Sequence, residues 1–241
     1  MDERFLLLQT RKSDDLMRGQ EIDCFARALS CRLEQIDVCD LLSAAPTRQH
    51  LDSVDVVLLG GSGDFSVAEG GPWLADAMVA MRELFELGKP TFASCWGFQA
   101  MAKALGGEVV TDKRRAELGT IQVFLTAAGR ADPVFGPTGG SFLAPMGHQD
   151  CVVRLPEQAV LLASSAKVEN QAYCFPGKPI YGTQFHPELN RTALIERIRA
   201  YPQYAREISG LPIDDFVLSL QETTATDQLL GRFMQWWRSN R

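Results

Sequence analysis

The chain has 241 residues, of which 46% are hydrophobic, and its 24 Lys and Arg against 30 Asp and Glu give a net charge of -6. This length suits one well-packed domain, or one domain with an appendage. The acidic balance, with a pI near 5.2, argues against a nucleic-acid or anionic-membrane partner, and no window approaches the ~20 apolar residues of a membrane span. Six scattered cysteines without a CxxC motif favour reduced thiols in a cytoplasm over disulfides or a zinc site.

The first hundred residues alternate between short apolar runs and amphipathic segments. The pattern predicts strands over 5–9, 35–39, 54–59 and from Thr91, a polar loop over 11–19, and helices over 21–33, 72–87 and 99–105. Such alternation is typical of the α/β class, with a doubly wound, mostly parallel sheet whose site lies at the carboxyl ends of its strands.

A glycine-rich segment, Gly60-Gly61-Ser62-Gly63-Asp64, follows the third of these strands. Glycines let backbone N–H groups approach a bound oxygen closely. The segment lacks the Lys-Ser/Thr of a nucleotide-binding P-loop and the GxGxxG pattern, so nucleotide binding is the weaker interpretation. Taken alone, the segment is best explained as an ordinary turn between a strand and a helix, whereas beside a nucleophile turn it favours an oxyanion and substrate loop.

The stretch Lys89 to Met101 reads as strand, tight turn and helix, with Cys95 on the turn. A nucleophile in such a turn is exposed at the end of its strand, and the next backbone N–H can face a developing oxyanion. The helix that follows favours a thiolate at its N-terminus. The small neighbours Ala93 and Gly97 suit a strained turn, whereas a lone cysteine here would be read as a core residue.

After Gly106-Gly107 the hydrophobic period changes to two. Short strands are expected over 108–111, 120–125, 141–144, 151–155, 160–164, 172–175 and 179–184, as antiparallel hairpins that complete the sheet.

The last of these strands ends in His186-Pro187-Glu188. Pro187 biases His186 towards an extended backbone, and residues two apart in an extended chain project to the same side. Of the three histidines, only His186 stands in a His-Pro-Glu sequence. A histidine near a thiol, oriented by an acid, is the general logic of a catalytic triad.

The segment beyond residue 190 is predicted to be a helical extension, 191–241, packed on the domain formed by 1–190. Its first helix, over 192–199, is expected to point away from the strand that carries His186, and Tyr201-Pro202 ends it. Trp236 and Trp237 near the end would leave a large apolar patch if unpacked.

Three motifs in order, Ala-Ser-Cys-Trp-Gly-Phe-Gln, Gln-Phe-His-Pro-Glu and the upstream Gly60–Asp64 segment, resemble the class I (triad-type) glutamine amidotransferases. The similarity is greatest to free-standing members like the glutaminase domain of GMP synthetase, and it covers roughly residues 5–190. The family's Gly-x-Cys-x-Gly is here Ala93-x-Cys95-x-Gly97. The stretch Met146–Asp150 resembles the family's Ser-His-x-Asp, with Gly147 in place of Ser.

This resemblance implies Cys95 as nucleophile, His186 as base and Glu188 as its orienting acid. It implies Gly61 and Trp96 as oxyanion N–H donors, and substrate contacts at Gly63, Gln99, Gln149 and Asp150. His148 and Asp150 are equally well explained as a pair that stabilises a turn. The resemblance implies no metal and no organic cofactor.

The sequence thus predicts a hydrolase of a γ-glutamyl amide, with glutamine as the substrate and a separate ammonia-accepting enzyme as a partner. Two alternatives stay open: a peptidase acting on γ-glutamyl peptides, and a binding or regulatory module that retains the fold without catalysis.

Overall fold

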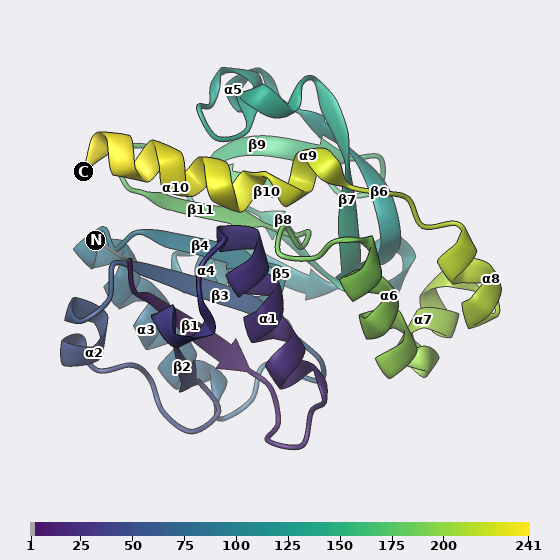
Figure 1. Ribbon diagram of the computed structural model, residues 1–241, viewed down its shortest axis with the longest axis horizontal. Coiled ribbons are helices and arrows are strands. Elements are labelled where there is room, and N and C mark those ends of the chain that lie inside the picture. The colour runs from purple at the N-terminus through teal and green to yellow at the C-terminus, as the bar shows by residue number, and fades with distance from the viewer. Residues whose placement is uncertain (1–2) are drawn as a thin grey trace.

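A nine-stranded sheet in the order β2-β1-β3-β4-β11-β10-β9-β6-β7 is the centre of the computed structural model, which describes residues 3–241 (Figure 1). The strands from β2 to β11 in this order run parallel, and β10, β9, β6 and β7 extend the sheet by antiparallel pairing. The bounds are β1 Phe5–Thr10, β2 Ile36–Asp40, β3 Val56–Ser62, β4 Thr91–Ser94, β6 Glu117–Leu125, β7 Ser141–His148, β9 Val160–Ser165, β10 Ala172–Cys174 and β11 Ile180–Thr183. The predicted α/β class is confirmed.

Helices cover both faces of this sheet. The helices α1 (Met17–Leu29) and α10 (Leu229–Asn240) pack in one hydrophobic cluster, and α3 (Leu74–Leu87) and α4 (Trp96–Ala104) pack in another. The strands contribute to both clusters because successive side chains alternate between the faces. In β1, Phe5 and Leu7 face the first cluster, and Leu6 and Leu8 face the second. The sheet is therefore doubly wound.

Short helices fill the remaining connections. They are α2 Arg48–Asp52, α5 Ala127–Ala131, α6 Arg191–Ala200, α7 Pro202–Ser209, α8 Ile213–Leu218 and α9 Thr224–Asp227, with 3-10 turns at Leu33–Gln35, Lys113–Arg115 and Gly136–Thr138. Neither α2 nor α5 was expected from the sequence. Each is a single turn capped by a threonine side chain, Thr47 or Thr126, and is too short to show helical periodicity.

Two expectations are wrong, one about the bounds of a helix and one about the pairing of two strands. The first helix begins at Met17, within the predicted loop, and ends at Leu29 because Ser30 takes the left-handed conformation (φ 53°, ψ 41°) that closes a helix. The strands β5 (Glu108–Thr111) and β8 (Asp150–Arg154) pair with each other in a separate two-stranded sheet instead of joining the main sheet.

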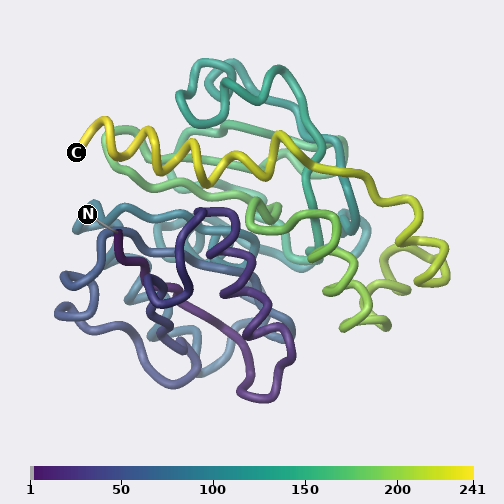
Figure 2. Tube along the Cα trace, viewed as in Figure 1, coloured from purple at the N-terminus to yellow at the C-terminus, as the bar shows by residue number. Residues whose placement is uncertain are grey.

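The C-terminal segment runs along the whole molecule. The helices α6, α7 and α8 lie together at one end, and α10 returns along the sheet to the end where the chain begins (Figure 2). There Arg238 forms an ion pair of 2.7 Å with Glu3, which places the last helix beside the first strand. Residues 1–2, which the sequence assigned to the first unit, lie outside the described residues.

Candidate active site

Cys95 occupies a strained turn between β4 and α4. Its backbone has φ 49° and ψ -102°, in a region that non-glycine residues rarely adopt. The Cys95 N–H donates to the carbonyl of Thr183 on β11 at 2.8 Å, so the turn is tied to the neighbouring parallel strand. The structure therefore places the thiol at the carboxyl end of the sheet, as the sequence predicted.

Small residues surround this turn because the backbones approach closely. A Cβ on Gly97 would lie 2.3 Å from Leu59 Cβ, so no side chain fits there. Ala93, in contrast, lies within β4, opposite Leu59 of β3 and Gly182 of β11, and is fully buried. A methyl group is accommodated at position 93, and a side chain at position 97 is not.

Glycine at position 95 should relieve the strain in this turn. A backbone conformation of this kind costs about 1–3 kcal/mol in a non-glycine residue, whereas glycine costs roughly 0.5–1 kcal/mol through chain entropy. Cys95→Gly should therefore have a higher free energy of unfolding than Cys95→Ala, by up to about 2 kcal/mol in urea denaturation. An alanine variant as stable as the glycine variant would show that no strain is stored at residue 95.

His186 and Glu188 follow β11, the strand adjacent to β4. The His186 Nδ1 lies 2.7 Å from Glu188 Oε1, and both side chains are buried. Because an ionised carboxylate only accepts hydrogen bonds, Nδ1 donates its proton to Glu188, and the ring also interacts with the Cys95 side chain. The structure thus brings together the base and the acid that the sequence predicted.

Electrostatics favour a charged histidine in this pair. Burial lowers the pKa of His186, but the Glu188 carboxylate and then the Cys95 sulfur raise it, to about 9 in all. Burial raises the pKa of Glu188, yet the imidazole and then Arg197 hold it below its ordinary value. The imidazolium and the carboxylate are therefore the favoured forms at neutral pH.

Gly61 lies against both His186 and Cys95. A Cβ there would stand 2.8 Å from His186 Cε1 and 3.8 Å from Cys95 Cβ. Leu8 of β1 pairs with Leu59, and Thr10 pairs with Ser62, so Gly60 and Gly61 together oppose a single residue in a bulge. A bulge leaves an extra residue outside the ladder, which brings this backbone to the site. Trp96, the other predicted oxyanion donor, is the first residue of α4 and is buried.

A cavity of about 680 Å³ opens in front of Cys95. All four predicted substrate contacts line it: Gly63, Gln99, Gln149 and Asp150. Two of them are already engaged in the fold. Gln99 Nε2 donates to the Asp150 carbonyl and to Gln184 Oε1, each at 3.1 Å. The Asp150 carboxylate accepts hydrogen bonds from Ser66 Oγ at 2.7 Å, Thr111 Oγ1 at 2.6 Å and the Ala68 N–H at 3.1 Å.

His148 does not pair with the Asp150 side chain. Its Nδ1 lies 3.0 Å from the Asp150 carbonyl, and its Nε2 lies 3.2 Å from Glu117 in a buried polar cluster with Gln171 and Ser165. These contacts hold the connection between β7 and β8 and favour the structural alternative for His148.

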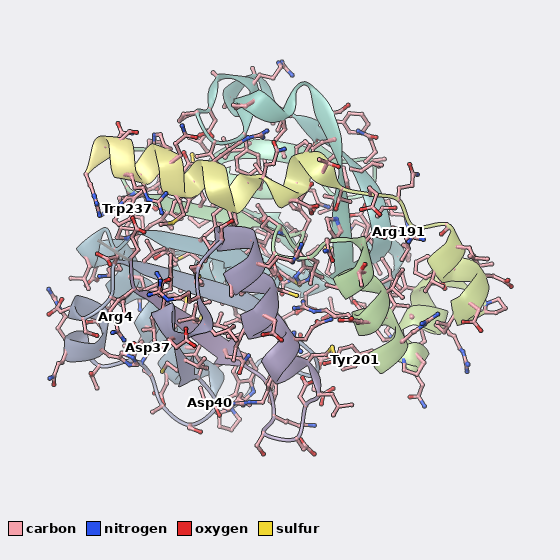
Figure 3. All side chains as sticks on the ribbon, in the orientation of Figure 1. Arg4, Asp37, Asp40, Arg191, Tyr201 and Trp237 are labelled. Atoms are coloured by element: carbon pink, nitrogen blue, oxygen red, sulfur yellow. The ribbon has the colours of Figure 1, made fainter. Side chains whose placement is uncertain are left out.

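The C-terminal helices form part of the cavity wall. The sequence predicted that the helix now seen as α6 points away from the site, and this was wrong. Its residues Leu194, Arg197 and Ile198 line the cavity, as do Tyr201 and Tyr204 beyond it. Figure 3 shows Tyr201 where α6 meets α7. The sequence places Arg197 between Leu194 and Ile198 on one face of the helix, but this pattern does not indicate which residues the face contacts.

Residues 3–241 contain neither a candidate membrane-spanning helix nor a candidate metal-binding cluster. No helix there is long and apolar enough to cross a membrane. No group of three or more His, Cys, Asp or Glu in that range could hold a metal ion.

Among curated proteins, the chain is 31% identical over 222 residues to the GMP synthase (glutamine-hydrolyzing) of Marinobacter nauticus, covering 86% of this chain and 41% of that protein. It is 32% identical over 160 residues to the enzyme of the same name from Leifsonia xyli, covering 66% of this chain and 30% of that protein. The chain therefore spans less than half the length of these relatives.

Among solved structures, a glutamine amidotransferase from Thermotoga maritima superposes with a TM-score of 0.75 at 22% identity, covering 98% of each chain. A glutamine amido transferase from Methylobacillus flagellatus superposes with a TM-score of 0.71 at 18% identity, covering 98% of this chain and 95% of that chain. At this identity the likeness supports the fold. The family model of class I glutamine amidotransferases matches residues 23–198, and the chain belongs to this family.

Proposed function

We propose that the protein hydrolyses the side-chain amide of glutamine through Cys95, His186 and Glu188. The observation that carries the proposal is the 2.7 Å pair of His186 and Glu188, which follows the strand next to β4, the strand that leads into the strained turn at Cys95. A nucleophile, a base and an acid that orients the base are the components that acyl transfer needs. The names of the curated relatives, which specify glutamine hydrolysis, support the same substrate.

In the first half of the reaction, the Cys95 thiolate attacks the γ-carbonyl carbon of glutamine. The N–H groups of Gly61 and Trp96 stabilise the oxyanion. The C–N bond breaks as the His186 imidazolium gives its proton to the leaving amine, so ammonia departs and a γ-glutamyl thioester remains on Cys95. Glu188 holds the Nδ1–H throughout, which keeps Nε2 directed at the reacting atoms.

In the second half, neutral His186 takes a proton from water as the water attacks the thioester carbonyl. The C–S bond breaks, glutamate leaves, and the thiolate and imidazolium are restored. Each cycle converts glutamine and water into glutamate and ammonia. Gly63, Gln99, Gln149 and Asp150 are proposed to contact the substrate, the last two through their backbone. The ammonia acceptor is proposed to be an enzyme outside these 241 residues.

A γ-glutamyl peptide is the second candidate substrate. The cavity of about 680 Å³ falls in the range that holds drug-sized ligands, and it extends from Cys95 to the C-terminal helices. A leaving group larger than ammonia would lie against those helices. We also propose a cytoplasmic location, which the free state of all six cysteines supports.

The test compares glutamine with a panel of γ-glutamyl dipeptides, with glutamate release as the measurement. We expect glutamine to be hydrolysed by the wild-type protein and left intact by Cys95→Ala. Preference for a dipeptide by more than tenfold in kcat/KM would support the peptidase instead. Absence of hydrolysis with every compound, in a folded protein, would support the binding module and reject the proposed function.

A further inference from the structure

A buried arginine of α6 lies directly behind the proposed triad. The Arg197 side chain is 9% exposed, and its Nη1 lies 3.6 Å from Glu188 Oε1 and 3.4 Å from His186 Nδ1. Its Nε donates to Gln20 Oε1 of α1 at 2.9 Å, which fixes the guanidinium plane. Burying a charge is costly unless it is paired, so the buried guanidinium needs a partner of opposite charge.

The two contacts of Nη1 differ in kind. Nδ1 of His186 donates its proton to Glu188 at 2.7 Å, and Nη1 of Arg197 is itself a donor. Two donors at 3.4 Å cannot form a hydrogen bond. The guanidinium therefore attracts the Glu188 carboxylate and repels a positive charge on His186.

A second buried carboxylate balances the other side of the guanidinium. Arg197 Nη2 lies 3.8 Å from Glu21 Oε1, and the Glu21 side chain is fully buried. Glu21 also accepts from Gln9 Nε2 at 3.0 Å and from Arg11 Nη2 at 3.2 Å. A Cβ on Gly60 would stand 2.3 Å from Glu21 Oε1, so this carboxylate lies against the start of the glycine bulge. A line of alternating charges thus runs from the acid of the triad to the loop beside the nucleophile.

We propose that Arg197 is a positioning residue that holds Glu188 ionised and directed at His186, and that Glu21 holds Arg197 in turn. This inference deepens the proposed function and rests on it for its catalytic consequence. Its structural content, a charge on α6 that acts on the histidine, stands on the contacts alone.

The reaction itself needs such a residue. His186 is positive when the thiolate attacks and neutral after it has protonated the leaving amine. A fully buried Glu188 beside a neutral imidazole would lack a counter-charge and would favour its protonated form. Arg197 supplies a positive charge that stays in place through the whole cycle. Glu188 therefore remains an acceptor for Nδ1–H while His186 acts as the base towards water.

Two polar atoms of Arg197 and Glu188 have no hydrogen-bond partner among residues 3–241. They are Arg197 Nη2 and Glu188 Oε2, both buried. One is a donor and the other an acceptor.

Charged and titratable groups reach this cluster from every element packed around it. Those that act on His186, Glu188 or Arg197 are Cys95 from the turn before α4, Glu21, Cys24 and Arg27 from α1, and Tyr201 from the end of α6. Arg11 after β1 acts on Glu21, and Tyr204 of α7 acts on Cys95. The ion-pair contact between Arg197 and Glu21 lies behind the triad. Two substitutions, one at each residue, test it, because they should shift the titration midpoint of His186 in opposite directions.

The test is the titration of the His186 ring by NMR, which needs no substrate. The chain has only three histidines, so the spectrum of His186→Ala identifies the signal, and His50 and His148 serve as internal references. In Arg197→Met the loss of a nearby positive charge makes the His186 ring hold its proton more tightly. The midpoint should therefore rise, by about one to three pH units for a charge at this distance.

Glu21→Gln should move the same midpoint in the opposite direction and by less, because it removes a more distant negative charge. Arg197→Lys should leave it nearer to the wild-type value. The matched control is Arg199→Met on the same helix, which removes an exposed charge from a 3.8 Å contact with Asp214 and should leave His186 unchanged.

Midpoints that stay fixed, or that move in the same direction in Arg197→Met and Glu21→Gln, would overturn the proposal. If Arg197→Met does not fold, the double variant Arg197→Met with Glu21→Gln removes both charges and should still raise the midpoint. An unchanged titration midpoint of His186 in a folded double variant would also overturn the proposal. Wild-type protein that hydrolyses neither glutamine nor a γ-glutamyl peptide would reject the proposed function, while the opposite shifts would still establish the action of Arg197 on His186.

Discussion

Replacing Cys95 with alanine should lower kcat for glutamine hydrolysis by on the order of 10⁶-fold, the loss typical when the nucleophile of a triad hydrolase is removed. The loss is expected because no other thiol can substitute. Cys24, Cys151 and Cys174 lie elsewhere in the fold, and burial raises the pKa of these three thiols to about 11, 11 and 12. The measurement is glutamate release by purified protein, with circular dichroism to show that the variant is folded.

Two further variants extend this prediction to the rest of the triad. His186→Ala should lose about 10² to 10⁴ in rate, as expected for a general base. Glu188→Gln should fall between His186→Ala and the wild type, because the histidine can still reach the thiol without its orienting acid. Turnover by Cys95→Ala above a few per cent of wild type would identify another nucleophile. A Glu188→Gln variant equal to wild type would reduce the working unit to Cys95 and His186.

Removing α10 should unfold the protein. Its buried side chains belong to the same hydrophobic cluster as β1, β3 and β4: Leu229, Leu230, Phe233, Met234 and Trp237. Burial of each such side chain contributes about 1.5–3 kcal/mol, so together they contribute roughly 8–15 kcal/mol. That sum matches the ~5–15 kcal/mol by which domains are stable. A chain ending at residue 227 should therefore be insoluble or lack a cooperative unfolding transition.

Single substitutions on α10 separate packing from chain length. Phe233 lies 5.4 Å from Phe92 and 5.7 Å from Tyr181, measured between ring centroids, so Phe233→Ala should cost about 3–5 kcal/mol in urea denaturation. Gln235→Ala on the exposed side of the helix is the matched control and should stay within about 0.5 kcal/mol of wild type. A soluble, active chain ending at residue 227 would show that α10 is an appendage. Figure 3 shows Trp237 on this helix near its end.

The features that the sequence predicted are those that depend on residues close together in the chain. The turn at Cys95 and the His186-Pro187-Glu188 segment after β11 are short motifs whose spacing and backbone preferences are local. Gln99 and Asp150 were identified through the family resemblance, but the hydrogen bonds that occupy Asp150 come from Ser66 and Thr111, which are far away in sequence. The separate pairing of β5 with β8 could not be read from a period of two, because periodicity gives the strand and not its partner.

Arg197 shows the same limit within the site. Its helix was predicted, and its charge was visible, but an arginine on a helix usually faces water. Whether it lies behind Glu188 depends on the path of the chain after residue 190 and on the packing of α6 against α1. That information is distributed over Gln20 and Glu21 of α1 and Glu188 after β11, which are far apart in the sequence.

The adjacency of β4 and β11 bears on how such a protein can change over evolutionary time. Cys95 and His186 follow neighbouring parallel strands, so their separation is set by the fixed spacing of hydrogen-bonded strands. The residues between α4 and β10 do not enter that ladder. Insertions in that region, at exposed turns such as 139–140, should leave the reacting groups aligned. The part of the cavity wall that α7 forms is a separate segment of the chain and does not include Arg197. Descendants of one ancestor could therefore acquire new substrates by altering this wall while they inherit the same reaction chemistry.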